Sequence, residues 1–173
     1  MFHDDELGRE VKSALKERAR NGVRVYVLYD EIGSNTLPKS YVNELRDAGV
    51  EIRDFHTRKG PGNRFQINFR NHRKIVVVDG HTAWVGGHNV GDEYMGRDPD
   101  FSPWRDTHVR IEGPSAQVAQ ALFLGDWYWA TRTMPELDWE PQPAASGADL
   151  KVMVLPIAPT DTIDTAQLFF VHT

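Results

Sequence analysis

The chain has 173 residues, enough for one α/β-sized domain with a hydrophobic core of its own. Its composition, with 40% hydrophobic and 26% charged residues, excludes a collagen-like, coiled-coil or disordered chain, and no apolar run is long enough to cross a bilayer. The absence of cysteine excludes disulfides, thiolate metal sites and a thiol nucleophile, while the net charge of -5 weighs against a general nucleic-acid binder.

The first third of the chain alternates helices and strands. Helical spacing of apolar residues predicts a helix over 4–20, and the β-branched and aromatic run 23–29 predicts a strand. A second helix over 38–49 and a short strand over 50–53 follow. This order with short connections predicts an α/β fold in which helices flank both faces of a mixed, mostly parallel sheet.

The next part of the chain predicts a hairpin, one more strand and a helix. Strands over 74–78 and 82–85 flank the turn dipeptide Asp79-Gly80, and a further strand is predicted over 107–111. A helix then opens at Pro114 and runs to about residue 127, and its apolar and aromatic stripe is typical of a helix packed on a core.

The end of the chain differs in composition from the rest. Residues 135–148 are acidic and then rich in Pro and Ala, without periodicity, as in a linker. A strand over 151–155 and a helix over 162–173 are predicted beyond it. We therefore expect one unit over 1–134 and the start of a second unit over 149–173.

Positive charge is concentrated between Phe55 and Val78. This stretch contains no Asp or Glu, and its six basic residues are Arg58, Lys59, Arg64, Arg70, Arg73 and Lys74. A solvated basic loop is the plain interpretation of such a run. Because the run leads directly into the strongest motif of the chain, we expect it to attract one anionic ligand instead.

The strongest motif joins His72 and Lys74 to Asn89. Residues two apart on a strand share a face, so the imidazole and the ammonium project together. The glycine pair Gly86-Gly87 lets backbone approach a ligand closely, and Asn89 adds an amide donor just after it. Imidazole, ammonium and amide together suit phosphodiester chemistry without a metal.

A metal site is the alternative interpretation of His72, His81 and His88. Imidazole is a common metal ligand, but scattered histidines alone seldom make a metal site. We therefore expect neither a metal nor another cofactor.

The spacing His72-x-Lys74-x4-Asp79 resembles the His-x-Lys-x4-Asp motif of the phospholipase D superfamily, and almost the whole chain resembles its bacterial cardiolipin synthase branch. The segments that resemble it are Phe2 to Gly8, Val27 to Ser34, Asn71 to Asp79, Val85 to Tyr94 and Trp104 to Pro114. The resemblance implies a phospholipase D-like lobe over 1–134, a linker over 135–148 and the start of a second lobe over 149–173.

The resemblance also implies roles for single residues. His72 attacks the phosphorus, Lys74 and Asn89 hold phosphate oxygens, and Asp79 anchors the turn. Asp106 hydrogen-bonds the far nitrogen of the catalytic imidazole, which fixes its tautomer; a simple charge at a strand edge is the alternative for this residue.

Four further residues complete the expected site. Gly86 and Gly87 are structural, and Gly87 stands where the commonest form of the family has a serine. Arg70 and Arg73 are expected to bind the substrate, since basic residues near a membrane surface attract anionic headgroups.

The implied reaction transfers a phosphatidyl group between two phosphatidylglycerols through a phosphohistidine. The family uses two such motifs and this chain has one, so we expect the first catalytic half of a longer enzyme, inactive alone and completed by a second lobe in cis or by association. The whole enzyme is expected at the bacterial inner membrane, cytoplasmic face or peripheral, without nucleic acid, and the chain itself is expected to be soluble.

Two other classes of function stay open at this point. One is a homodimeric phosphodiesterase or nuclease in which two copies of His72 meet across a two-fold axis. The other is a non-catalytic module that binds phosphate or lipid.

Overall fold

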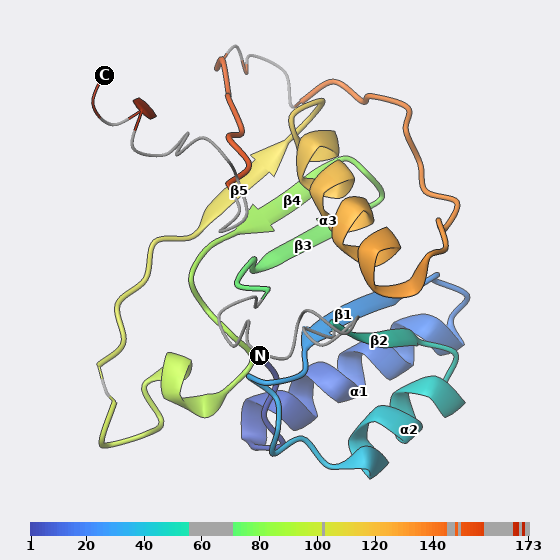
Figure 1. Ribbon diagram of the computed structural model, residues 1–173, viewed down its shortest axis with the longest axis vertical. Coiled ribbons are helices and arrows are strands. Elements are labelled where there is room, and N and C mark those ends of the chain that lie inside the picture. Colours follow the sequence, from blue (N-terminus) through green and yellow to red (C-terminus); the bar gives the residue numbers. More distant parts are fainter. Residues whose placement is uncertain are drawn as a thin grey trace, which may run out of the picture.

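The computed structural model describes residues 1–55, 71–101, 103–144, 148, 150–157, 168, 169 and 171. Three α-helices, one short 3₁₀ helix and five strands are named within them (Figure 1). The elements in chain order are α1 (Glu6–Arg20), β1 (Tyr26–Asp30), α2 (Lys39–Asp47), β2 (Glu51–Phe55), β3 (Ile75–Val78), β4 (Thr82–Val85), η2 (Asp92–Met95), β5 (Val109–Glu112) and α3 (Ala116–Thr131).

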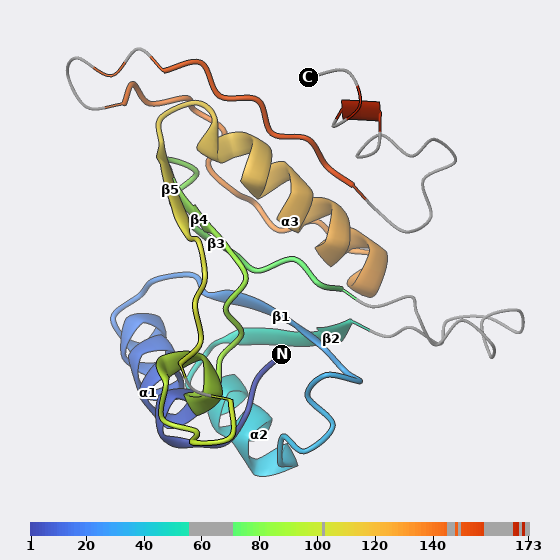
Figure 2. The same ribbon diagram turned by 90° about the vertical axis from the view of Figure 1, so that its left-hand side faces the viewer.

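The first sheet pairs β1 with β2 in parallel and lies between helices. Neighbouring residues of a strand point to opposite faces, and here Val27 packs with the α1 and α2 side while Tyr26 meets the ring of Trp127 on α3, with ring centroids 5.4 Å apart. Figures 1 and 2 show α1 and α2 on one side of this sheet and α3 on the other. The predicted helices on both faces are present around β1 and β2.

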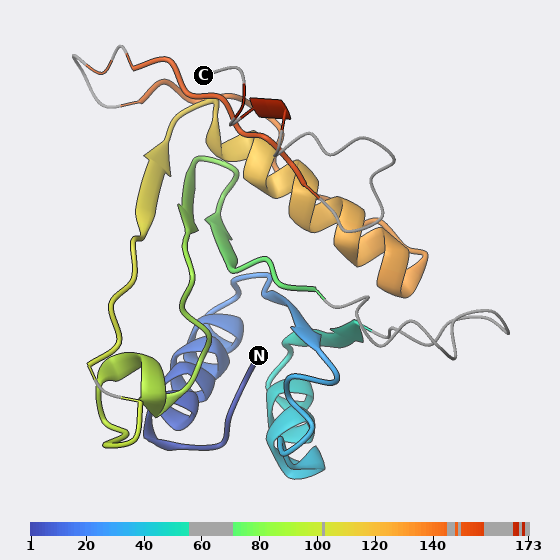
Figure 3. The ribbon, with the colours of Figure 1, turned by 60° about the vertical axis from the view of Figure 1, so that its left-hand side comes forward.

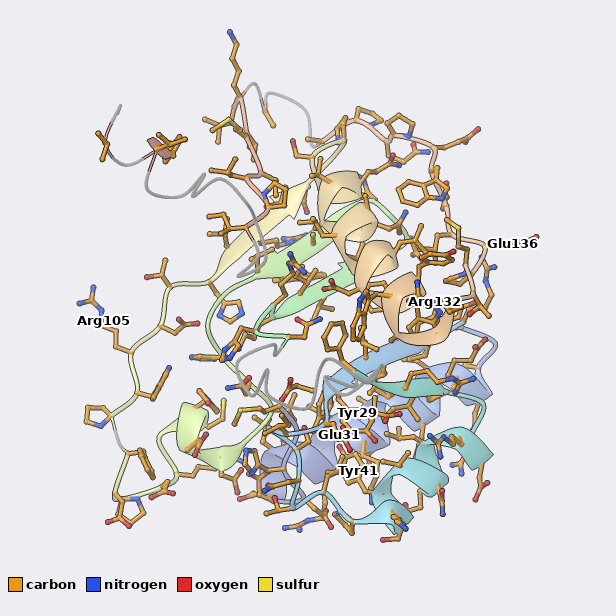
Figure 4. The ribbon with its side chains drawn as sticks, in the orientation of Figure 1. Tyr29, Glu31, Tyr41, Arg105, Arg132 and Glu136 are labelled. Atoms are coloured by element: carbon orange, nitrogen blue, oxygen red, sulfur yellow. The ribbon has the colours of Figure 1, made fainter. Side chains whose placement is uncertain are left out.

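The core of this region forms where α1 and α2 cover the sheet. Asp5 caps α1 by accepting a hydrogen bond from the amide of Gly8 at 2.8 Å. The fully buried Tyr41 of α2 donates its hydroxyl to the carbonyl of Gly8 at 2.5 Å, and burial raises the pKa of this phenol (Figure 4). The buried residues of this first cluster are Val27, Tyr41, Val42, Leu45, Val50 and Ile52.

The second sheet is antiparallel, in the order β3-β4-β5. Asp79 and Gly80 are the first two of the three residues, 79–81, that join β3 to β4, and their φ angles of 51° and 65° are the left-handed conformation of a hairpin turn. The hairpin predicted from Asp79-Gly80 is therefore confirmed.

Helix α3 covers one face of this sheet. Ile75 and Val77 of β3 pack there with a second cluster, formed by Ala83, Ala116 and Ala119. On the opposite face Val76 is 59% exposed and Val78 is 46% exposed.

The arrangement of strands differs from the prediction. The described residues contain one parallel and two antiparallel strand pairings in two separate sheets, besides an isolated parallel bridge, so a mostly parallel sheet is not confirmed. The physical reason is the tight turn at Asp79-Gly80, which can only return the chain antiparallel to β3.

The structure also shifts element ends by a few residues. The strand predicted over 23–29 begins at Tyr26, which pairs with Glu51, the first residue of β2. The helix predicted to end at about residue 127 continues to Thr131.

The described residues after α3 contain little regular structure. Residues 133–144 form neither helix nor strand, and the strand predicted over 151–155 is not formed, because no described strand lies beside it to complete a ladder. The helix predicted over 162–173 falls mostly outside the described residues. Of the helices that the structure describes, none has the length and apolar character to cross a bilayer.

Candidate active site

His72 and Lys74 lie in the segment that enters β3. His72 is exposed, and the Lys74 ammonium donates a hydrogen bond to the carbonyl of His72 at 2.7 Å. The carbonyl of Lys74 accepts from the amide of Gly86 at 3.4 Å. The two parts of the sequence motif, 72–74 and 86–89, therefore meet at one end of the β3-β4 hairpin.

Two carboxylates hold this segment in place, and sequence reasoning missed both. The buried Asp30, at the end of β1, accepts from the amide of Asn71 at 3.1 Å. Asp126 of α3 accepts from the Asn71 side chain at 2.9 Å and from the Arg73 guanidinium at 2.7 Å. Asp126 could have been noticed, because it is the single charged residue in the sequence of α3.

The two arginines predicted to bind substrate have different outcomes. Arg73 is engaged in the ion pair with Asp126 and also donates to the carbonyl of Ile157 at 3.3 Å. Arg70 lies outside the described residues, as do Arg58, Lys59 and Arg64. A substrate-binding role for either arginine stays a prediction.

Asn89 is positioned by the short helix that follows it. Its side-chain amide donates to the hydroxyl of Tyr94 on η2, and its carbonyl oxygen accepts from the amino group of Met1 at 3.2 Å. Burial raises the pKa of Tyr94, so this hydroxyl stays protonated at neutral pH. The next residue, Val90, forms a parallel bridge with Phe2.

Positions 86 and 87 require glycine, because other side chains lie where the Cβ atom of a larger residue would stand. A Cβ atom on Gly86 would lie 2.3 Å from Nδ1 of His108, and one on Gly87 would lie 2.5 Å from Oδ1 of Asp106. The Gly87 amide donates to Oδ2 of Asp106 at 2.8 Å. A serine at position 87 would therefore require the Asp106 carboxylate to move.

Asp106 lies beside two imidazoles. Its Oδ2 is 2.9 Å from Nδ1 of His108 and 3.8 Å from Nε2 of His88. Burial raises the pKa of this carboxyl, but hydrogen bonds from the Gly87 and Thr107 amides and the nearby histidines outweigh it, so the pKa lies below its ordinary value. The resemblance predicts that Asp106 contacts the His72 imidazole. Among the described residues, the contacts of Asp106 do not include this imidazole.

The neighbouring Arg105 does not join this group. Its side chain extends away from the ribbon into solvent, as Figure 4 shows, and the residue is exposed. The side chains beside Asp106 are therefore imidazoles, and the Arg105 guanidinium is not among them.

The arrangement is suited to chemistry on an exposed anionic group. The His72 residue is exposed, the Lys74 ammonium lies beside its backbone, and the hydrogen bond from the Gly86 amide to Lys74 holds the 86–89 segment at the same end of the sheet. An imidazole can attack phosphorus, and a cation can stabilise negative charge on the oxygens.

Comparisons with known proteins agree with this chemistry. The sequence profile described as "Cardiolipin synthase, PLD-like domain" matches residues 1–127. Cardiolipin synthase A of Pseudomonas fluorescens (strain SBW25) and that of Pseudomonas syringae pv. syringae (strain B728a) are each 53% identical to this chain over 172 residues. Cardiolipin synthase A of Pseudomonas putida (strain W619) is 52% identical over the same length.

These alignments cover 99% of this chain and 36% of each relative, so the chain spans just over a third of their length. The match to residues 1–127 contains the whole motif from His72 to Asn89 and reaches into α3. The chain therefore belongs to the family of phospholipase D-like domains of cardiolipin synthases.

Proposed function

We propose that this chain is the first catalytic lobe of a phosphatidyltransferase that joins two phosphatidylglycerol molecules into cardiolipin. The observation that supports this most directly is the meeting of 72–74 with the glycine pair at the end of the hairpin, within a domain of the cardiolipin synthase family. The lobe comprises residues 1–134, with a linker over 135–148 and the start of a second lobe over 149–173.

The proposed reaction has two displacement steps at phosphorus. A ring nitrogen of His72 forms a bond to the phosphorus of one phosphatidylglycerol, and the bond to the glycerol oxygen breaks. The leaving oxygen takes a proton from a general acid, for which the family resemblance implies a histidine of the second lobe. The hydroxyl of the second phosphatidylglycerol then attacks the phosphohistidine and gives its proton to the same second-lobe histidine, and the bond between phosphorus and His72 breaks.

The other motif residues act on charge and position. Lys74 and Asn89 stabilise the non-bridging oxygens as negative charge develops on them. Asp30 and Asp126 are positioning residues: Asp30 binds the backbone amide of Asn71, and Asp126 binds the side chains of Asn71 and Arg73, on both sides of His72. Asp79 shapes the turn, at the opposite end of β3 from His72.

The complete enzyme is proposed to act at the bacterial inner membrane, from the cytoplasmic face or as a peripheral protein. Its substrate is an anionic phospholipid, and its second lobe joins in cis or by association. Within the complete lobe we expect both sheets to belong to one mixed sheet, since Asp30 at the end of β1 already binds the segment that enters β3.

The test uses the complete enzyme with phosphatidylglycerol vesicles. We expect wild type to form cardiolipin and a phosphohistidine that is trapped by acid-free quenching, and we expect His72→Gln to form neither. Asp47→Asn, on α2 and away from the motif, serves as the matched control and should retain wild-type activity.

Two results would contradict the proposal. One is cardiolipin formation by His72→Gln at the wild-type rate. The other is full activity of the 173-residue chain without a second lobe, whether on phosphatidylglycerol or, as a dimer, on DNA or a simple phosphodiester. Recovery of activity when the chain is mixed with a separately made second lobe would support it.

A further inference from the structure

Helix α3 is apolar on the side that faces solvent as well as on the side that packs against the sheets. Its buried side contains Ala116, Ala119 and Trp127. Asp126 is the only charged residue in the sequence of this helix. Because helices that are apolar all round are buried on all sides in folded proteins, we expect the solvent side of α3 to be covered.

The exposed residues of α3 lie in one row, and we call them its outer face. They are Val118, Ala121, Gly125 and Tyr128, with Val118 exposed by 42% and Tyr128 by 46%. They follow one another at spacings of three, four and three residues, which is the spacing at which helices pack against helices. An uncharged surface of this kind is typical of an interaction site.

Helix α1 shows how a solvated helix of this chain differs. Its exposed side carries charges of both signs, among them Arg9, Glu10, Glu17 and Arg18. Charged residues on the side opposite the core are the ordinary pattern of a surface helix. The outer face of α3 lacks this pattern.

Gly125 lies inside the outer face and in the interior of the helix. Glycine at such a position costs about 1 kcal/mol of helix stability relative to alanine. A Cβ atom there would meet no neighbour within 4 Å among the described residues, so the described part of the chain does not require glycine. Gly125 and Ala121, one turn apart, let a second helix approach closely, because the distance between packed helices depends on the side chains at the contact.

The chain beyond α3 returns to this helix. In Figures 2 and 3 the segment 150–157 lies alongside α3. The carbonyl of Ile157 accepts a hydrogen bond from the Arg73 guanidinium at 3.3 Å, and the same guanidinium binds Asp126 of α3 at 2.7 Å. The chain therefore reaches residue 157 at the flank of α3.

We propose that the outer face of α3 is the surface on which the second lobe of the complete enzyme docks, through an apolar side of one of its helices. This inference rests on the proposed function, which assigns a second lobe to the complete enzyme. The alignments leave most of the length of each relative uncovered, and the described chain reaches residue 157 beside this surface. These two observations favour the second lobe over a second copy of the chain or a lipid surface.

Docking on α3 places the second lobe beside His72. Through Asp126, the flank of the same helix binds the side chains of Asn71 and Arg73, the neighbours of His72 in sequence. A lobe that packs on the outer face is therefore held in a fixed relation to the segment that carries His72. The general acid of the proposed reaction then comes from a part of the enzyme that α3 orients.

The test compares thiol reactivity in the 173-residue chain and in the complete enzyme. This chain has no cysteine, so Ala121→Cys places one thiol on the outer face, and Ala14→Cys places a matched thiol on an exposed alanine of α1. We expect a maleimide, followed by peptide mass spectrometry, to label position 121 roughly tenfold or more slowly in the complete enzyme than in the 173-residue chain. Position 14 should be labelled equally in both proteins.

A charged variant tests the same surface without a thiol. Ala121→Arg should leave the Tm of the 173-residue chain within about 2 °C of wild type, because position 121 is exposed there. In the complete enzyme it buries an unpaired charge, so cardiolipin formation should fall by roughly tenfold or more. Ala14→Arg is the matched control and should retain wild-type activity.

The proposal is wrong if position 121 is labelled equally in both proteins, or if Val78→Cys on the open face of the second sheet is protected in its place. Protection in the 173-residue chain that disappears on dilution would assign the outer face to a second copy, and protection only with phosphatidylglycerol vesicles would assign it to lipid. Either result contradicts the proposal. Labelling does not depend on turnover, so a protected position 121 in an enzyme that forms no cardiolipin would contradict the proposed function alone.

Discussion

The two hydrophobic clusters differ in the size of their side chains. The first, under β1 and β2, contains Tyr41, Leu45 and Ile52, each fully buried. The second, between α3 and the antiparallel sheet, contains three alanines as its buried members, and the far face of its sheet is exposed at Val76 and Val78. The site residues that the structure describes flank this second, thinly packed sheet.

The difference shows that the chain separates its scaffold from its chemistry. Large apolar contacts stabilise the first region, whereas polar contacts anchor the segments around the site. Asp30 and Asp126 hold the entry to β3, and Asp92 holds η2 against the start of α1. We therefore expect mutations in the first region to change stability and mutations of the polar anchors to change the site.

The largest effect is expected from the first cluster. Leu45 is fully buried, so Leu45→Ala should lower the free energy of unfolding by about 2–5 kcal/mol, through lost burial and the cavity left behind. Urea denaturation followed by circular dichroism measures it. Val78→Ala on the exposed sheet face is the control, with a change of about 0.5 kcal/mol or less. Equal losses for both variants would refute the contrast.

An intermediate effect is expected at the anchor of the entry to β3. Asp126→Asn removes the charge from the 2.7 Å contact with Arg73 and should lower stability by about 1–2 kcal/mol. In the complete enzyme we expect kcat to fall while KM for phosphatidylglycerol stays close to wild type, because His72 is displaced but the binding surface is not.

Glu44→Gln is the matched carboxylate control for this anchor. Glu44 pairs with Lys12 and Lys16 in the first region, so its loss should leave kcat unchanged. A normal kcat in Asp126→Asn, or an equal loss in both variants, would show that the Asp126 contact does not position His72.

The smallest effect concerns pH. The Leu7 amide, with the Glu6 amide and Arg97, holds the pKa of Asp92 below its ordinary value of 3.8 despite some burial. A lowered folded pKa contributes stability above the unfolded pKa, and the contribution disappears as pH falls through the folded value. Asp92→Asn should therefore have a lower Tm than wild type at neutral pH, and the difference should shrink below about pH 3.8.

Salt distinguishes this anchor from a surface ion pair. The pKa of Glu44 is lowered by hydrogen bonds from Lys16 and Lys12, so added salt should screen its contribution. The Asp92 contribution depends chiefly on backbone amides and should persist in salt. If salt removes both differences in Tm, Asp92 acts as an ordinary surface charge.

Local chemistry made much of the fold predictable. The Asp79-Gly80 turn was predicted because its two residues alone favour the left-handed backbone of a hairpin. The start of β1 was misplaced because Val23 is β-branched yet 48% exposed, and only the register with β2 decides that pairing starts at Tyr26. Pairing between distant strands is a tertiary property that composition does not encode.

The candidate site was predictable only where spacing reflects a single strand. His72 and Lys74 share a motif, whereas Asp106 becomes a neighbour of His88 through the β4-β5 register, across a long loop. The sequence therefore did not indicate that Asp106 lies beside His88. Asp30 and Asp126 were missed for the same reason, since each reaches Asn71 from a different element.

The separations of the polar anchors along the chain bear on the order of folding. The β1-α2-β2 unit is continuous over residues 26–55, whereas Asn71 reaches Asp126 across 55 positions and the Glu6 amide reaches Asp92 across 86. Contacts between distant positions require costly loop closure, so we expect the local unit to form first during synthesis. The segments around His72 and Asn89 then become ordered late, after residue 126 has been made.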